Sequence, residues 1–252
     1  MAPAGGHSRS EIPEVRRLKL AAALTDQTFS ANKISKLKTM AISLIQHADG
    51  KHRCSWCGQG DAFADYIHYH DHEWGMPVVD DQRLFEKITL EGFQAGLSWI
   101  TILRKRDRFR EVFMQFDFEK VARFTEKDVD RLVTDAGIIR HRGKIESAIN
   151  NAQKVCSLID TQGTGALAKL IWSHEPTAKQ RPAQITPEAA MTLTQTEQSQ
   201  ALSKTLRKMG FNFVGPTTMY ALMQSMGVVN DHLEGCAHRV QVESARKALK
   251  RP

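Results

Sequence analysis

Apolar residues recur at steps of three and four along most of this chain of 252 residues. This spacing places them on one face of an α-helix, whereas a half-buried strand would alternate apolar and polar residues. Between residues 80 and 116 the apolar positions at helical spacing are Leu84, Phe85, Ile88, Phe93, Leu97, Ile100 and Leu103. Since neither strand-type alternation nor an internal repeat is found, the sequence predicts an all-α fold.

Changes in composition divide the chain into three parts. Residues 1–50 begin with a small, polar stretch and continue with an amphipathic pattern from Ile34 to Ile45, so we expect partial disorder with one or two short helices. Residues 51–238 should form the folded domain, and residues 239–252 a basic tail.

Capping and helix-breaking residues predict where some helices of the domain begin and end. Thr125, with Asp128 three residues later, resembles a capping box at the start of a helix. Gly210 is suited to end one helix, and Pro216 to begin the next, which Gly227 would close.

The chain is basic, with 35 Lys and Arg residues against 28 Asp and Glu residues and a net charge of +7. Such an excess favours a polyanionic partner, nucleic acid above all. Many soluble proteins are mildly basic, so the distribution of the charges is more informative. The cations gather at residues 103–110, 140–144, 202–208 and 245–252.

No apolar run approaches the roughly 20 residues that a membrane-spanning helix needs. The N-terminus also lacks the basic and then apolar order of a secretory signal. We therefore expect a cytoplasmic monomer with no membrane contact, whose four cysteines are thiols or metal ligands. An organellar targeting peptide within residues 1–50 is the alternative, against which Glu11 and Glu14 argue.

The segment DAGIIRHRGKI, residues 135–145, suggests a helix-hairpin-helix. A glycine permits close approach of the backbone, two isoleucines anchor the turn in the core, and a second helix from about Arg140 would direct free amides at a phosphate. The candidate DNA-binding residues are Gly137, Ile138, Ile139, Arg140, Arg142 and Lys144. Taken alone, the segment is better explained as a structural hairpin with a solvated basic edge.

Cysteine and histidine residues gather near both ends of the domain. His232 and Cys236 are four residues apart, so one turn of helix would place them on the same face. Cys54 precedes a run of alternating histidines at residues 68–72. Two Cys and two His would make a closed zinc site, structural because no position is left for water.

Several runs of residues, in one order, resemble the 3-methyladenine DNA glycosylase I family, the TAG-type branch of the helix-hairpin-helix DNA glycosylases. The runs are RCSW (53–56), YHDHEWGMPV (69–78), LFEKITLEGFQAGLSWITIL (84–103), DAGIIRHRGKI (135–145), LSKTLRKMGFNFVGPT (202–217) and GVVNDHLEGC (227–236). So many long motifs are far more specific than one short pattern. The resemblance implies the helix-hairpin-helix glycosylase fold and an enzyme that flips 3-methyladenine out of alkylated double-stranded DNA, leaving an abasic site.

The resemblance also selects the metal ligands. In this family a structural Zn²⁺ joins the N-terminal and C-terminal segments, and the matching residues are Cys54, His70, His232 and Cys236. The CxxC pair of Cys54 and Cys57 is a rival that could serve a zinc knuckle or thiol exchange. We disfavour it because Cys57 falls outside the family's ligand positions and no thioredoxin-like pattern surrounds it.

A pocket for a cationic base should combine aromatic faces with a carboxylate. Glu91 lies among apolar residues of a predicted helix, and its helical phase points inward. The resemblance implies that Glu91 is the catalytic residue, which hydrogen-bonds the extruded base while Tyr69 and Trp99 pack around it. Further pocket candidates are Trp74, Tyr66 and Trp56, and Leu97 is a candidate wedge for the gap in the DNA. Core packing is the alternative for the aromatic residues and for Leu97.

The expected reaction is hydrolysis of the N-glycosidic bond by water, without a covalent enzyme intermediate. Other helix-hairpin-helix glycosylases carry a catalytic Asp after the hairpin, whereas IESAINNAQK follows Lys144 here. A cationic purine is already a good leaving group, so selection and positioning can supply most of the remaining rate.

Two other classes of function are alternatives. One is a non-catalytic helix-hairpin-helix DNA-binding protein, and the other is a zinc-stabilised helical interaction protein whose basic patches are merely solvated. Both leave the pocket around Glu91 unexplained.

Overall fold

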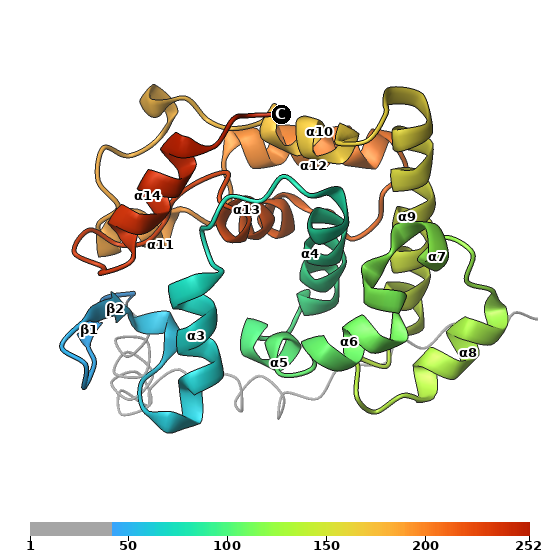
Figure 1. The fold of residues 1–252 in the computed structure, drawn as a ribbon, viewed down its shortest axis with the longest axis horizontal. Coiled ribbons are helices and arrows are strands. Elements are labelled where there is room, and N and C mark those ends of the chain that lie inside the picture. Colours follow the sequence, from blue (N-terminus) through green and yellow to red (C-terminus); the bar gives the residue numbers. More distant parts are fainter. Residues whose placement is uncertain (1–41) are drawn as a thin grey trace, which may run out of the picture. The chain divides into compact units, whose positions relative to one another are not determined.

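The structure, a computed structural model, describes residues 42–252, and the amphipathic pattern before residue 42 lies outside them. This part of the chain is mostly helical, as predicted (Figure 1). Its α-helices are α3 (Ala64–His72), α4 (Asp81–Gln94), α5 (Trp99–Leu103), α6 (Arg106–Val112), α7 (Phe118–Val121), α8 (Glu126–Thr134), α9 (Arg142–Gln162), α10 (Ala166–Trp172), α11 (Pro187–Thr192), α12 (Glu197–Lys208), α13 (Pro216–Ser225) and α14 (Arg239–Ala248). Short 3-10 helices are η2 (Ser55–Cys57), η3 (Asp61–Phe63), η4 (Met114–Phe116) and η5 (Ala178–Gln180).

A small antiparallel hairpin departs from the all-α expectation. Strand β1 (Leu44–Gln46) pairs with β2 (His52–Cys54), with Leu44 opposite Cys54. The expected short helices of residues 1–50 therefore do not extend to β1. Strands of three residues are too short to show alternation, and the hairpin is held by a distant segment, since the Ala237 N–H donates to the His52 carbonyl at 2.9 Å.

Helix α4 lies at the centre, with α9 beside it and α5 and α6 below its C-terminal end (Figure 1). The Asp80 side chain caps its first turn by accepting from the Arg83 N–H. The Asp81 carboxylate accepts from the Gly165 and Ala168 N–H groups at 2.7 and 2.8 Å, which satisfies amides at the start of α10. Most of α4 is buried, and its buried residues include the polar side chains of Asp81, Glu86, Lys87, Thr89 and Glu91.

The predicted helix boundaries are confirmed at several positions. The Thr125 and Asp128 side chains form the capping box of α8. Pro216 is the first residue of α13. Gly210 and Gly227, with φ of +86° and +72°, follow the ends of α12 and α13 in the left-handed region that suits glycine.

Most of residues 239–252, which we expected to be a basic tail, form α14. Val242 is buried, and the Arg246 guanidinium binds the Glu175 carboxylate at 2.7 Å and the Val228 carbonyl at 2.9 Å. These contacts fix α14 on the folded domain. Within residues 42–252, no helix has the length and apolar character that crossing a bilayer would require.

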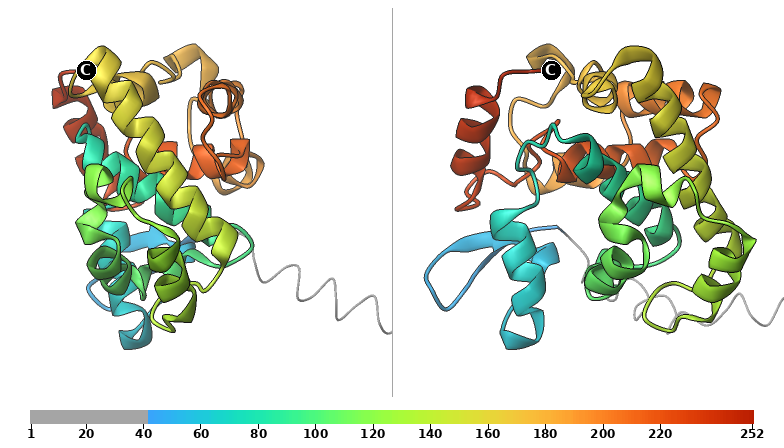
Figure 2. Two further views of the ribbon diagram at one scale, coloured as in Figure 1. Left: turned by 90° about the vertical axis from the view of Figure 1, so that its right-hand side faces the viewer. Right: turned by 45° about the vertical axis from the view of Figure 1, so that its right-hand side comes forward.

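Helix α9 is the longest helix of the described residues and contacts α4, α7, α8 and α10 (Figure 2, left). It begins at Arg142, two residues after the predicted start, because His141 is its N-cap and accepts from the Lys144 N–H at 3.3 Å. Residues 135–141 connect it to α8, against which it packs.

Candidate functional site

Five aromatic side chains predicted to line a pocket lie together around α3. Tyr66 and Tyr69 are one helical turn apart on α3, and Trp99 opens α5 with its ring centroid 5.4 Å from that of Tyr69. Trp56, from η2, lies 5.1 Å from Tyr66 and 4.9 Å from Trp74 between ring centroids. The cluster therefore joins three segments into one aromatic wall.

Glu91 lies on α4 and is buried, in agreement with its helical phase. One of its carboxylate oxygens is 2.9 Å from the ammonium nitrogen of Lys87, one turn earlier on the same helix. The Lys87 ammonium also donates to the Tyr69 hydroxyl at 2.9 Å and lies 3.2 Å from the ring centroid of Trp99. Glu91, Tyr69 and Trp99 therefore surround a single buried cation.

Lys87 was not among the predicted site residues. A lysine on a helix is ordinarily solvated, yet Lys87 is only 5 % exposed. The one signal in the sequence is its spacing of four residues from Glu91, which places both side chains on the same face of α4. Burial lowers the pKa of Lys87 to about 8, although the Glu91 carboxylate opposes this effect.

This lowered pKa predicts a pH-dependent contribution to stability. Unfolding returns Lys87 to its ordinary pKa of about 10.4, so between pH about 8 and 10.4 the unfolded chain binds the additional proton. The free energy of unfolding of the wild type minus that of Lys87→Met should therefore rise with pH in this window, by at most about 1.4 kcal/mol per unit. Both proteins retain the other charged groups that shift the pKa of this ammonium, which are Glu91, Glu73 and Arg106. Urea unfolding at several pH values measures the difference, and a flat difference would contradict the lowered pKa.

An unpaired donor faces the same region. The buried indole N–H of Trp99 has no hydrogen-bond partner among the described residues. Leaving such a group unpaired costs about 1–3 kcal/mol, so an acceptor atom of a ligand would be stabilising there. The cavity bordered by Tyr69, Lys87 and Trp99 has a volume of only about 10 Å³, enough for about one water molecule.

Four buried side chains form a group that could hold a metal ion. The ligand atoms of Cys54, His70, His232 and Cys236 all lie within 4.8 Å of one another. The Cys236 sulfur is 3.6 Å from Nε2 of His70 and 3.4 Å from Nδ1 of His232, and the Cys54 sulfur is 3.9 Å from that Nδ1. These separations suit four donors around one small cation.

The outer ring nitrogens of both histidines have oxygen partners. Nδ1 of His70 is 2.8 Å from an Asp71 carboxylate oxygen, and Nε2 of His232 is 3.0 Å from the Trp74 carbonyl. Such partners accept the ring proton and leave the inner nitrogen with its lone pair directed at the centre, as metal-binding histidines require. The residues present therefore fit a cation.

The rival cysteine is not part of this group. The Cys57 sulfur contacts the Gly58 carbonyl at 3.7 Å, and Cys57 is absent from the four clustered residues. His68 and His72 are exposed and contact each other. His232 and Cys236 lie in a turn between α13 and α14, not on a helix as expected, and the turn still places them together.

The turn between α8 and α9 is anchored from α6. The Arg108 guanidinium pairs with Asp135 at 2.7 Å, and Asp135 in turn accepts from the Gly137 N–H at 2.7 Å. A Cβ at Gly137 would lie 2.6 Å from Arg108 Cγ, which shows how closely this turn is packed. Ile138 is buried and Ile139 is partly buried, so both pack inward from the turn.

The three predicted cations of this segment differ in their surroundings. Arg140 is exposed and forms no ion pair with any residue of 42–252. Arg142 instead pairs with Glu126 and Asp130 of α8. Lys144 points away from solvent, since its ammonium donates to the carbonyls of Phe93 and Ala95 at 2.8 and 2.7 Å. The expectation that Lys144 faces an external phosphate is therefore wrong, because these carbonyls end α4 and bind a cation.

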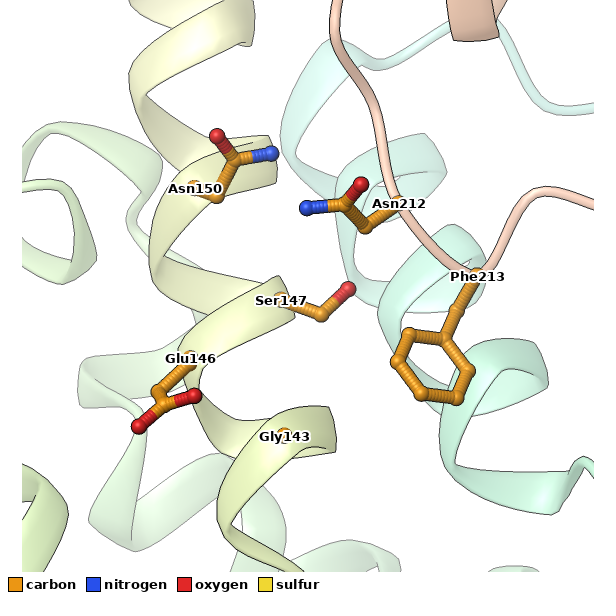
Figure 3. A pocket seen from close by; sticks show the side chains of 6 residues that line it. All are labelled: Gly143, Glu146, Ser147, Asn150, Asn212 and Phe213. Carbon is orange, nitrogen blue, oxygen red and sulfur yellow. The ribbon is translucent and has the colours of Figure 1, made fainter.

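An open hollow of about 450 Å³ lies beside the start of α9 (Figure 3). Its lining comes from α9 and from the segment between α12 and α13: Gly143, Glu146, Ser147, Asn150, Asn212 and Phe213. Leu97, from the segment between α4 and α5, is 42 % exposed. The core alternative for Leu97 does not match this exposure, and its side chain is accessible to a partner.

Comparison with known proteins identifies the family. A model of the methyladenine glycosylase family matches residues 56–240. The chain belongs to this family. It is 48 % identical over 187 residues to the DNA-3-methyladenine glycosylase of Haemophilus influenzae, covering 73 % of this chain and 96 % of the relative. It is 49 % identical over 189 residues to DNA-3-methyladenine glycosylase 1 of Escherichia coli, covering 73 % and 95 %. A crystal structure of a 3-methyladenine DNA glycosylase I superposes with a TM-score of 0.67 at 45 % identity, covering 73 % of this chain and 98 % of that one.

The part that matches the methyladenine glycosylase family includes the site just described. All five aromatic residues, Glu91 and Lys87 lie within residues 56–240. Three of the four clustered metal-type ligands also lie within it, and Cys54 lies two residues before its start. The family match and the clustered side chains therefore coincide.

Proposed function

We propose that this protein is a DNA glycosylase that removes 3-methyladenine from alkylated double-stranded DNA by hydrolysing the N-glycosidic bond. Its relatives named as DNA-3-methyladenine glycosylases are aligned over nearly their whole length. The observation that carries the proposal is one buried place where a carboxylate, two aromatic faces and an unpaired indole N–H meet around a cation.

This place suits the chemistry of the damaged base. A 3-methyladenine nucleotide is cationic, so an aromatic face and a carboxylate both stabilise it, and more strongly in a dry pocket than in water. In our proposal the base is flipped out of the duplex, Tyr69 and Trp99 pack around its ring, and the Glu91 carboxylate accepts a hydrogen bond from it. The indole N–H of Trp99 can then donate to an acceptor on the base.

Bond cleavage needs little further chemistry from the protein. Water adds to C1′ of the sugar and releases one proton to solvent, while the electron pair of the C1′–N bond moves to the purine and neutralises its charge. A cationic purine leaves readily, so holding it in position supplies most of the rate. Glu91 stabilises the cationic base within the pocket, and no covalent enzyme intermediate is formed.

We further propose that Cys54, His70, His232 and Cys236 hold a structural Zn²⁺. Two thiolates and two imidazoles are its preferred closed ligand set. The ion would tie the β1–β2 hairpin and the α13–α14 turn to α3. Because all four positions are filled by protein, the ion takes no part in the hydrolysis.

For DNA contact we propose that α8, the turn 135–141 and α9 act as a helix-hairpin-helix. The Arg140 side chain is exposed, and the first amides of α9, before the Lys144 N–H that His141 caps, would bind a phosphate. The exposed Leu97 is proposed to fill the gap that the flipped nucleotide leaves. Phosphate contacts of this kind carry no sequence information, as a search for scattered lesions requires.

Arg140→Ala is expected to weaken binding to duplex DNA. It should also make the binding constant less dependent on salt concentration, by the amount that corresponds to about one phosphate contact. Arg142→Ala should have a smaller effect, because Glu126 and Asp130 already compensate that charge. Titrations at several salt concentrations give both slopes. Equal slopes for the wild type and Arg140→Ala would contradict the assignment of the hairpin.

The proposed reaction is tested by incubating methylated duplex DNA with the metal-replete protein and separating the released bases by chromatography. We expect 3-methyladenine, and no release of hypoxanthine or 8-oxoguanine from duplexes that contain them, because these bases are neutral. DNA binding without any release of 3-methyladenine would instead indicate a non-catalytic binding protein.

A further inference from the structure

The Lys87 ammonium occupies the position that the proposed function gives to the damaged base. It lies over the Trp99 ring, against the Tyr69 hydroxyl and beside the Glu91 carboxylate, at 3.2, 2.9 and 2.9 Å. An ammonium over an indole face and next to a carboxylate satisfies the same interactions that a cationic purine would make. A purine that makes these contacts would occupy the position of the ammonium, so the two cannot bind at the same time.

We propose that Lys87 is a built-in competitor of the base: its ammonium holds Glu91 and Trp99 in the free protein and must leave when the alkylated base enters. This inference rests on the proposed function, since it takes Glu91, Tyr69 and Trp99 as the base pocket. Lysine suits the role because its flexible stem lets the charged head move to solvent while the stem stays buried.

Whether Glu91 favours the base or the Lys87 ammonium changes during the reaction. The incoming nucleotide is cationic and replaces the ammonium as the counter-charge of Glu91. Once the C1′–N bond breaks and its electron pair moves to the ring, the free base is neutral and no longer compensates that carboxylate. Lys87 then returns to Glu91, and its return expels the product.

Without Lys87 the product should remain bound. Lys87→Met keeps a long, flexible side chain but removes the charge, so free 3-methyladenine no longer competes with an ammonium. We expect this variant to bind the free base about tenfold more tightly or more, the size of a desolvated cation–π contact. Lys87→Gln, which can still donate to Glu91, is the second neutral variant in case Lys87→Met folds poorly, and thermal unfolding checks both.

Two quantities are measured. The first is base release by the wild type, and the second is the affinity of each of the three proteins for free 3-methyladenine, determined from the change in tryptophan fluorescence. Equal or weaker binding to both neutral variants would overturn the inference, even if the wild type releases 3-methyladenine normally. A wild type that releases no base would instead overturn the proposed function. The two failures are therefore distinguishable.

Displacement of the ammonium can also be observed directly in the wild type. An amine-reactive ester should label Lys87 slowly in the free protein and about tenfold faster or more with bound 3-methyladenine, because an amine reacts once it leaves a buried ion pair. Lys144 is the matched control, since it is similarly buried but bound to carbonyls outside the pocket. Labelling of Lys87 that stays slow while the base is bound would contradict the displacement.

Discussion

Glu91→Gln is expected to reduce release of 3-methyladenine from methylated DNA by about 10²- to 10³-fold, the range found when one aligned electrostatic contact to a reacting group is removed. Glutamine keeps the shape of the side chain and can still accept a hydrogen bond. It removes the negative charge that stabilises the cationic base, and it leaves Lys87 as an uncompensated ammonium in the pocket. Single-turnover release at saturating enzyme measures the effect without a contribution from product dissociation.

Glu86→Gln is the matched control for this variant. Glu86 is also buried on α4, and Arg83 and Arg110 bind its carboxylate at 2.9 Å each. Replacing it also removes a buried charge from ion pairs on the same helix, although these pairs do not involve the aromatic wall. Release should persist in Glu86→Gln once the folded fraction is taken into account. An equal loss in both variants would mean that Glu91 serves stability alone.

Loss of the metal group is expected to have the largest effect on stability. Cys236→Ser should abolish stoichiometric zinc and lower the free energy of unfolding by about 3 kcal/mol or more, since binding of a structural zinc contributes directly to folding. A strong chelator should produce the same decrease in the wild type. Zinc content per chain and urea unfolding measure the two effects.

Cys57→Ser provides the comparison. Cys57 is equally buried, but its sulfur contacts only a backbone carbonyl near the group. This variant should therefore keep one zinc per chain and nearly the stability of the wild type. Zinc that survives His70→Ala but disappears in Cys57→Ser would show that the ligand set is wrong.

Local features of the fold were predictable because they depend on neighbouring residues. The capping box of Thr125 and Asp128 and the first residue of α13 at Pro216 follow from backbone chemistry within one turn. The inward phase of Glu91 follows from the helical period. Each of these signals lies within a few residues of the structure that it specifies.

Features that depend on distant contacts were not predictable in this way. The β1–β2 hairpin is too short for a recognisable pattern and is held by the carbonyl and amide pair of His52 and Ala237. Lys144 turns inward only because the last carbonyls of α4 lie opposite it. Lys87 is buried because Tyr69 and Trp99, on other helices, enclose it. A lysine is ordinarily assigned to the surface, and its sequence neighbours do not reveal such an enclosure.

Two functions meet on one short helix. Tyr69 and His70 are adjacent in α3, and the first contacts Lys87 in the aromatic wall while the second belongs to the metal-type group. Trp56 connects the two regions, with its ring centroid 5.2 Å from that of His70 and 6.4 Å from that of Tyr69. A displacement of α3 that loosens one region must therefore shift the other. Amino-acid replacements in α3 are thus constrained both by the aromatic wall and by the metal-type group. Variants selected for altered base specificity should therefore seldom be found on the inner face of this helix.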